Sequence, residues 1–196
     1  MTLQVAFLRA VNVGRRAVRM DALREVFADM GWPQAQTFIA SGNVIFEHPP
    51  GSSPGLEERI AVRLATAFGF EIDTFVRSVD DIAALVATAV FEPVLVERCT
   101  THVVGFLKAP VRPSDQRLAH AWDNGVDRVV LRERELHWLS SARQSDSALS
   151  GAVFERTLGQ RLTLRGVPTL RRLIASLPAP VGPAKRSGSA PRQRSG

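Results

Sequence analysis

The sequence has little cysteine and lysine and lacks long apolar runs. Its one cysteine, Cys99, excludes a disulfide within the chain and fits a reducing compartment. No apolar run approaches the roughly 20 residues that a membrane-spanning helix needs, and the first residues carry no basic leader. We therefore expect a cytoplasmic protein with no membrane partner.

The candidate residues of this sequence do not form the motifs of common hydrolases, NTPases or metalloenzymes. Ser41 does not stand in a G-x-S-x-G nucleophile motif, and the sequence has no G-x-x-x-x-G-K phosphate-binding motif. Cys99 lies three residues before His102, but a closed structural zinc site needs four ligands and no second pair is present. None of the histidines has metal-ligand spacing: His48, His102, His120 and His137. We expect no metal and no cofactor, and the question of catalysis stays open.

The positive charge is unevenly distributed. The formal charge is +6 and the isoelectric point is near 11.0, which would favour a nucleic-acid partner. However, residues 179–196 hold four of the 25 basic residues and no acidic residue, so 21 basic residues face 19 acidic ones in the rest of the chain. Because RNP-like aromatic motifs are also absent, nucleic acid is a weakly supported partner.

Hydrophobic patterning predicts two successive units with one order of elements, β-α-β-β-α-β, each followed by an extra helix. The first unit is predicted as a strand over Leu3–Arg9, a helix over 20–30, a hairpin of Ala35–Ala40 and Val44–Glu47, a helix ending at Phe68, a strand over Phe70–Val76 and a helix over 78–89. The second is predicted as His102–Lys108, Ser114–Trp122, a hairpin of Arg128–Arg132 and Glu135–Leu139, Ser147–Leu158, Leu162–Leu164 and Val167–Leu177.

This order predicts an α+β fold of two tandem ferredoxin-like sandwiches with antiparallel sheets. The predicted domains are residues 1–92 and 100–177, which repeat in element order without a strong repeat of individual residues. Residues 178–196 are rich in Pro, Gly, Ser and Arg and predict a disordered basic tail.

Two polar turns of the first unit form the candidate site. Asn12-Val13-Gly14 follows the strand that ends at Arg9, and Ser41-Gly42-Asn43 joins the strands of the hairpin. The predicted topology brings both turns to one end of the sheet, where backbone amides and arginines would form an anion pocket. Arg9 also needs a partner or a ligand, because an unpaired buried charge is costly. The predicted ligand-binding residues are Arg9, Asn12, Gly14, Ser41, Gly42, Asn43 and Arg165.

A purely structural explanation of these residues stays open beside the functional one. Glycine and asparagine favour tight turns and bond to neighbouring backbone. Arg15, Arg16 and Arg19 would then line a solvated helix entrance.

Three motifs of the N-terminal part resemble a known bacterial family. They are Phe7-Leu8-Arg9-Ala10-Val11-Asn12-Val13-Gly14, Met20-x-x-Leu23 and Thr37-Phe38-Ile39-Ala40-Ser41-Gly42-Asn43-Val44-Ile45-Phe46. In this order they are similar to L-R-G-I-N-V-G, M-x-x-L and T-Y-I-Q-S-G-N-V-V-F of the domain-of-unknown-function 1697 family. The departures are Ala10, Val11, Phe38 and Ala40.

The similarity continues near the C-terminus. Ser145–Leu149 resembles a serine-rich segment of the family, and Thr163–Thr169 resembles its T-x-R-N-W-x-T motif, with Gly166 and Val167 in place of Asn and Trp. The resemblance implies a two-subdomain α+β fold and no established activity.

We expect a binding protein for an anionic small molecule or nucleotide at the loop end of the first unit. One alternative is a nucleic-acid-binding protein. Another is an enzyme with its site in the cleft between the units, in which Arg9 and Arg165 stabilise charge and Ser41 or a histidine transfers a proton. The sequence does not predict an oligomeric state.

Overall fold

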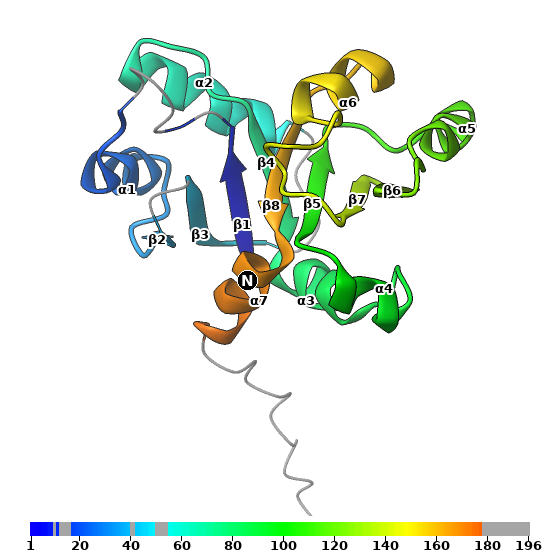
Figure 1. Ribbon diagram of the computed structural model, residues 1–196. Coiled ribbons are helices and arrows are strands. Elements are labelled where there is room, and N and C mark those ends of the chain that lie inside the picture. Colours follow the sequence, from blue (N-terminus) through cyan, green and yellow to red (C-terminus); the bar gives the residue numbers. More distant parts are fainter. Residues whose placement is uncertain (10, 12–16, 40–41, 50–54, 178–196) are drawn as a thin grey trace, which may run out of the picture.

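The computed structural model describes residues 1–9, 11, 17–39, 42–49 and 55–177 (Figure 1). In this part of the chain, seven helices accompany two four-stranded antiparallel sheets. The N-terminal half comprises β1 (Thr2–Leu8), α1 (Met20–Asp29), β2 (Gln36–Thr37), β3 (Asn43–His48), α2 (Leu56–Phe68), β4 (Thr74–Ser78) and α3 (Val79–Ala87). A connection containing α4 (Pro93–Arg98) leads to the C-terminal half. That half comprises β5 (Thr101–Leu107), α5 (Pro113–Ala121), β6 (Asp127–Arg132), β7 (Glu135–Ser140), α6 (Gly151–Leu158), β8 (Leu162–Gly166) and α7 (Val167–Ala175).

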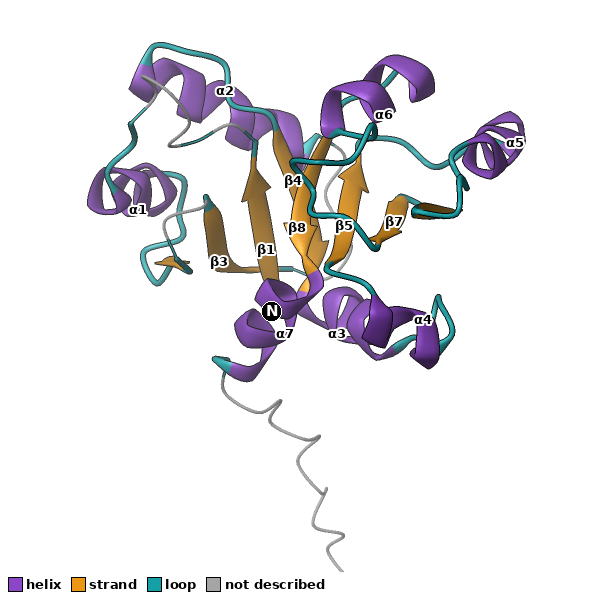
Figure 2. Cartoon of the chain, in the orientation of Figure 1, coloured by secondary structure: helices purple, strands orange, loops and turns teal. Residues whose placement is uncertain are grey.

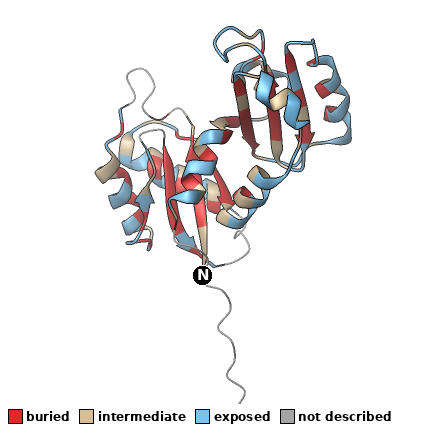
Figure 3. Ribbon diagram, turned by 60° about the horizontal axis from the view of Figure 1, so that its bottom comes forward, coloured by how far each residue is buried: buried red, intermediate tan, exposed pale blue. Residues whose placement is uncertain are grey.

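The two sheets have the same strand order. The first sheet is ordered β2-β3-β1-β4 and the second β6-β7-β5-β8, and all neighbouring strands are antiparallel. Helices α1 and α2 cover the outer face of the first sheet, and α5 and α6 cover that of the second (Figure 2). Each sheet and its two helices enclose a core of their own, and buried residues concentrate on the strands (Figure 3).

A third core joins the two halves. Phe7 of β1 and Phe106 of β5 are fully buried and stack with ring centroids 4.3 Å apart and planes 7° apart. Helices α3 and α7 begin directly after β4 and β8 and pack against each other, with Ile82 and Leu170 fully buried in this third core. Since burial of apolar surface is the main favourable term in folding, this core holds the halves together as one body.

The registers of the two sheets reveal a local correspondence between the halves. Phe7 lies opposite Asn43 of β3, and Phe106 lies opposite Glu135 of β7. Aligned in this way, β1 and its next residue read T-L-Q-V-A-F-L-R, and β5 and its next residue read T-H-V-V-G-F-L-K. In this strand pair, some individual residues repeat in addition to the order of elements.

Most of the predicted elements are present, with two instructive differences. The first predicted hairpin strand, Ala35–Ala40, is reduced to the two residues of β2, because Ile39 has a φ of 51° that interrupts extended backbone. Helix α4 was not predicted, and none of its six residues is buried, so it lacks an apolar stripe. Ser78 caps the start of α3, because its hydroxyl accepts a hydrogen bond from the Asp81 amide at 3.0 Å.

The two sheets agree with two tandem sandwiches, while the boundaries at 1–92 and 100–177 stay predictions. The predicted tail, 178–196, lies outside the described residues. None of the described helices is long and apolar enough to span a membrane.

Candidate functional site

The described part of the predicted Ser41-Gly42-Asn43 turn contacts the end of β1, whereas the whole Asn12-Val13-Gly14 turn lies outside the described residues. The Leu8 amide donates to the Gly42 carbonyl oxygen at 2.7 Å. Gly42 has a φ of 73°, and a Cβ atom there would lie 3.2 Å from the Cβ atoms of Leu8 and Val11. Asn43 closes the hairpin by donating from Nδ2 to the Phe38 carbonyl oxygen at 3.1 Å. The other predicted turn residues, Asn12, Gly14 and Ser41, lie outside the described residues.

Arg165 reaches this end of β1 from the C-terminal half. Its Nε donates to Asn43 Oδ1 at 2.7 Å, and its Nη2 donates to the Leu8 carbonyl oxygen at 2.9 Å. Its Nη1 donates to Thr163 Oγ1 and the Leu164 carbonyl oxygen, both at 2.8 Å. Burial lowers the pKa of Arg165 to about 10, because a charged group loses hydration there. The predicted residues Gly42, Asn43 and Arg165 thus meet, in contacts that join the two halves.

Arg9 also contacts the other half. Its Nη2 donates to Glu155 Oε2 of α6 at 2.9 Å, and its Nη1 lies 3.8 Å from Asp73 Oδ2. Arg161 approaches the same two carboxylates, at 3.9 Å from Asp73 and 3.8 Å from Glu155. Arg9 therefore has the partner that its position required, and it comes from a residue 146 positions away.

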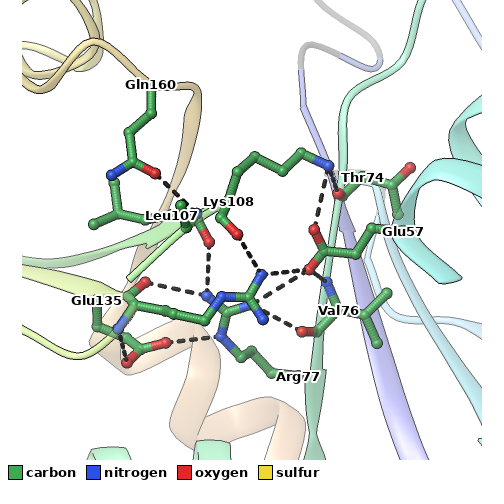
Figure 4. A network of polar contacts seen from close by, with 10 residues as sticks. Glu57, Thr74, Val76, Arg77, Leu107, Lys108, Glu135 and Gln160 are labelled. Carbon is green, nitrogen blue, oxygen red and sulfur yellow. Dashed lines mark hydrogen bonds and ion pairs between the residues drawn. The ribbon is translucent and has the colours of Figure 1, made fainter. Parts of the chain in front are cut away.

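Arg77 of β4 is the counterpart of Arg165 of β8, and it reaches from the N-terminal half into the C-terminal half. Arg77 is only 7% exposed, and its Nε donates to Glu135 Oε1 at 2.7 Å (Figure 4). Its Nη2 donates to the carbonyl oxygens of Leu107 and Arg134 at 3.0 and 3.1 Å, and its Nη1 donates to that of Val76 at 2.8 Å. Burial lowers the pKa of Arg77, and Arg134 has the same effect, while Glu135 and Glu57 oppose it.

Glu57 of α2 connects this arginine to two further basic residues. Its Oε1 accepts from Arg134 Nη2 and from the Val76 amide, both at 2.9 Å. Its Oε2 accepts from Lys108 Nζ at 3.3 Å, and Lys108 also donates to the Thr74 carbonyl oxygen (Figure 4). This network lies between the halves, and no sequence pattern predicted it.

A cavity of about 600 Å³ adjoins the network. Its N-terminal wall is formed by the start of β1, the end of β4 and the length of α3, with Gln4 and Arg77 among the lining residues. Its C-terminal wall is the tip of the β6–β7 hairpin with the neighbouring Phe106 and His137. Arg9, Gly42, Asn43 and Arg165 do not line this cavity.

A second cavity, of about 290 Å³, shares Leu85, Thr88, Val90 and His137 with the first. His137 is only 4% exposed, and burial, aided by the charges of Arg132 and His102, lowers its pKa to about 4. Burial and the charge of Arg171 lower the pKa of His102 as well. At neutral pH both imidazoles are therefore uncharged.

The remaining chemistry of the described residues is sparse. Burial raises the pKa of the Cys99 thiol, although the charge of Arg128 opposes this, so thiolate is disfavoured. Within the described residues, no group of three or more His, Cys, Asp and Glu side chains is placed to hold a metal ion. The donors of Arg9 and Arg165 that would stabilise charge in the enzyme hypothesis engage protein acceptors.

The sequence around Arg77 holds a signal that could have pointed to its buried contacts. Arg77 stands in the run Phe75-Val76-Arg77, next to residues that β propensity places in a sheet interior. The argument applied to Arg9 applies equally to Arg77, since a buried guanidinium needs fixed acceptors. The cavities, by contrast, depend on how the halves dock.

Comparisons with known proteins show the family and the fold. A search of curated proteins found no match. Among solved structures, the chain is similar to the conserved bacterial protein SP0830 from Streptococcus pneumoniae, with 19% sequence identity and a TM-score of 0.68 over 89% of this chain and 97% of that one. The family model described as "Protein of unknown function (DUF1697)" matches residues 1–137. The C-terminal motif similarity, at 145–149 and 163–169, lies beyond that match. Because the match spans well over half of the 196 residues, the chain belongs to the DUF1697 family.

Proposed function

We propose that this protein binds a small molecule in the 600 Å³ cavity between its two halves. The observation that carries the proposal is the joint lining of this cavity by both halves, at a volume within the roughly 300–1,000 Å³ of ligand pockets. Pockets at domain interfaces with a few convergent polar groups are the usual sites of small ligands.

The lining indicates a ligand with an apolar part and several polar groups. Leu85 and Val90 are half-buried and supply an apolar surface. Arg77 and Glu135 are held by each other at 2.7 Å, so their positions are fixed before a ligand arrives. Preorganised polar groups cost less ordering entropy on binding.

A fragment screen by NMR tests this proposal. Fragments should perturb amide signals of α3 and of the β6–β7 hairpin in the wild-type protein. Ala84 is an exposed residue of α3 that lines only the first cavity, so Ala84→Trp should fill the cavity and abolish these perturbations. Ala67→Trp is the matched control, because Ala67 is an exposed helical alanine that lines neither cavity.

Two outcomes would contradict the proposal. The first is a screen in which fragments perturb neither wall of the cavity. The second is a set of fragments that bind Ala84→Trp as well as they bind the wild type.

A second candidate function is binding of an anion, including a nucleotide phosphate, at the loop end of the N-terminal half. Arg9, Arg161 and Arg165 gather there with only Asp73 and Glu155 as their described acidic neighbours. The Arg161 side chain is 60% exposed, and its ion pairs are 3.8 Å or longer, so it can turn toward an incoming anion.

Titration with inorganic phosphate and with ATP tests the second candidate. A ligand at a hundredfold its Kd should add about 2.7 kcal/mol to the unfolding free energy, seen as a rise in Tm. Arg161→Gln should reduce that rise. Arg143→Gln, at an 80% exposed arginine paired with Asp146, should not. An unmoved Tm of the wild type would exclude this site.

We also infer a ferredoxin-like topology for each half. The antiparallel orders β2-β3-β1-β4 and β6-β7-β5-β8, with two helices on one face, support this inference. A crystal structure with a different strand order in either sheet would contradict it.

A further inference from the structure

The 290 Å³ cavity differs chemically from its larger neighbour. Its walls come from the end of α3, the following connection with α4, the sheet face of β5 and β7, and the start of α7. Most of the lining side chains are apolar, among them Val86, Phe91, Val96 and Val167. A mostly apolar wall favours a ligand with an apolar body.

The polar groups of this cavity are few and mainly basic. Arg171 of α7 and His102 of β5 lie close enough for the arginine to act electrostatically on the imidazole. Arg171 is exposed and forms no ion pair with any described residue, whereas Glu97 is the single acidic residue of the lining. His137 lies on the side shared with the larger cavity.

Phe91 and His102 contact each other in the wall of the cavity. Their ring centroids are 6.0 Å apart and their planes meet at 73°. Phe91 belongs to the connection between the halves and His102 to β5, so the contact fixes the imidazole against an apolar surface. An imidazole held in this way can present a ring N–H to an acceptor on a ligand.

We propose that this second cavity binds an apolar carboxylate, with the carboxylate against Arg171 and His102 and the hydrocarbon among the apolar side chains. Arginine recognises carboxylates through charge-assisted and bidentate hydrogen bonds, which a neutral ligand cannot form equally well. The proposal does not depend on a ligand in the larger cavity.

Isothermal titration calorimetry of the full chain with hexanoate, octanoate and octan-1-ol tests it. Octanoate should bind about 15-fold more tightly than hexanoate, which corresponds to ~0.8 kcal/mol for each of the two added methylene groups. It should also bind at least about tenfold more tightly than octan-1-ol, because charge-assisted hydrogen bonds are roughly twice as strong as neutral ones.

Two matched pairs of variants locate the site. Arg171→Gln should remove the preference for the acid over the alcohol, whereas Arg172→Gln, at the adjacent exposed arginine outside the lining, should retain it. Ala87→Trp should abolish octanoate binding, because Ala87 is an exposed α3 residue that lines only this cavity. Ala84→Trp, which fills the larger cavity, should leave octanoate binding intact, so this proposal and the proposed function can fail separately.

Three results would overturn the inference. They are no saturable binding of octanoate by the wild type, equal affinity for octanoate and octan-1-ol, and octanoate binding that survives Ala87→Trp in a folded protein. Circular dichroism of each variant verifies that it is folded.

Discussion

Arg77 and Arg165 occupy equivalent positions in the two halves, and each reaches into the other half. Arg77 is the fourth residue of β4, and Arg165 is the fourth residue of β8. Arg77 donates to the carbonyl oxygen of Leu107, the last residue of β5, and Arg165 donates to that of Leu8, the last residue of β1. Each guanidinium also lies over the phenylalanine of the opposite half, at 5.3 and 5.5 Å from the ring centroid. The interface is therefore built from two reciprocal arginine clamps.

Removing Arg77 should destabilise the protein strongly. Arg77→Ala leaves the partly buried carboxylate of Glu135 without its 2.7 Å partner, and loss of one member of a buried pair costs about 3–5 kcal/mol. Urea unfolding followed by circular dichroism measures the change. Arg143→Ala is the control, and as an exposed pair it should cost no more than about 1 kcal/mol.

The double variant Arg77→Ala with Glu135→Gln refines this prediction. Because glutamine removes the uncompensated charge, the double variant should recover part of the lost stability. Arg77→Ala within about 1 kcal/mol of the wild type would show that the clamp contributes little.

The stacked pair at the centre of the interface should show energetic coupling. Phe7→Ala and Phe106→Ala should each cost about 3–5 kcal/mol, as expected for fully buried phenylalanines. A double-mutant cycle built from Phe7→Leu, Phe106→Leu and the combination should give a coupling of about 0.5–1.5 kcal/mol, since the rings lie 4.3 Å apart. Phe27→Leu combined with Phe106→Leu is the control. Phe27 belongs to the core between the first sheet and helices α1 and α2, so the stability losses of these two substitutions should be additive.

The sequence predicted the order of elements well because the apolar periods are clear in most helices and strands. It also predicted that Arg9 needs a partner or a ligand, but it could not identify Glu155, since that pairing depends on the docking of α6 beside the end of β1. Helix α4 escaped prediction because nothing in it is buried. Asn43 was predicted to bind a ligand. In the structure, the described hydrogen bonds of its side chain join it to the Phe38 carbonyl oxygen and to Arg165. Polar contacts between residues far apart in the sequence leave no periodic pattern, so the sequence did not predict the interface between the two halves.

Gly42 should tolerate alanine less well than a glycine with similar backbone geometry. Gly42→Ala carries the cost of a left-handed conformation, about 1–2 kcal/mol, plus a close approach of the new Cβ atom to Leu8 and Val11 at 3.2 Å. Gly69 has a φ of 76°, and a Cβ atom added there would meet nothing within 4 Å, so Gly69→Ala carries the first cost alone. Thermal unfolding of both variants separates the two contributions, and equal losses would mean that the turn adjusts to the added methyl group.

His137 should make the protein less stable in acid. Its folded-state pKa of about 4 lies below the usual value of 6.5, so between these values the unfolded chain binds a proton that the folded chain does not. The histidine contribution is therefore fully present above pH ~6.5 and is lost as the pH falls toward ~4, by about 3 kcal/mol in total. Burial also lowers the pKa of His102, so this histidine likewise makes the folded protein less stable as the pH falls.

Unfolding free energies measured from pH 7 to pH 4 test this dependence. His137→Gln should flatten the slope relative to the wild type, because the titrating group is gone, although the variant loses some stability at pH 7. His120→Gln, at an exposed histidine of α5, is the matched control and should keep the wild-type slope. An NMR titration of the His137 ring protons gives the folded-state pKa directly. A midpoint near 6.5 would show that the imidazole is hydrated, and the slope in acid would then have to come from other groups.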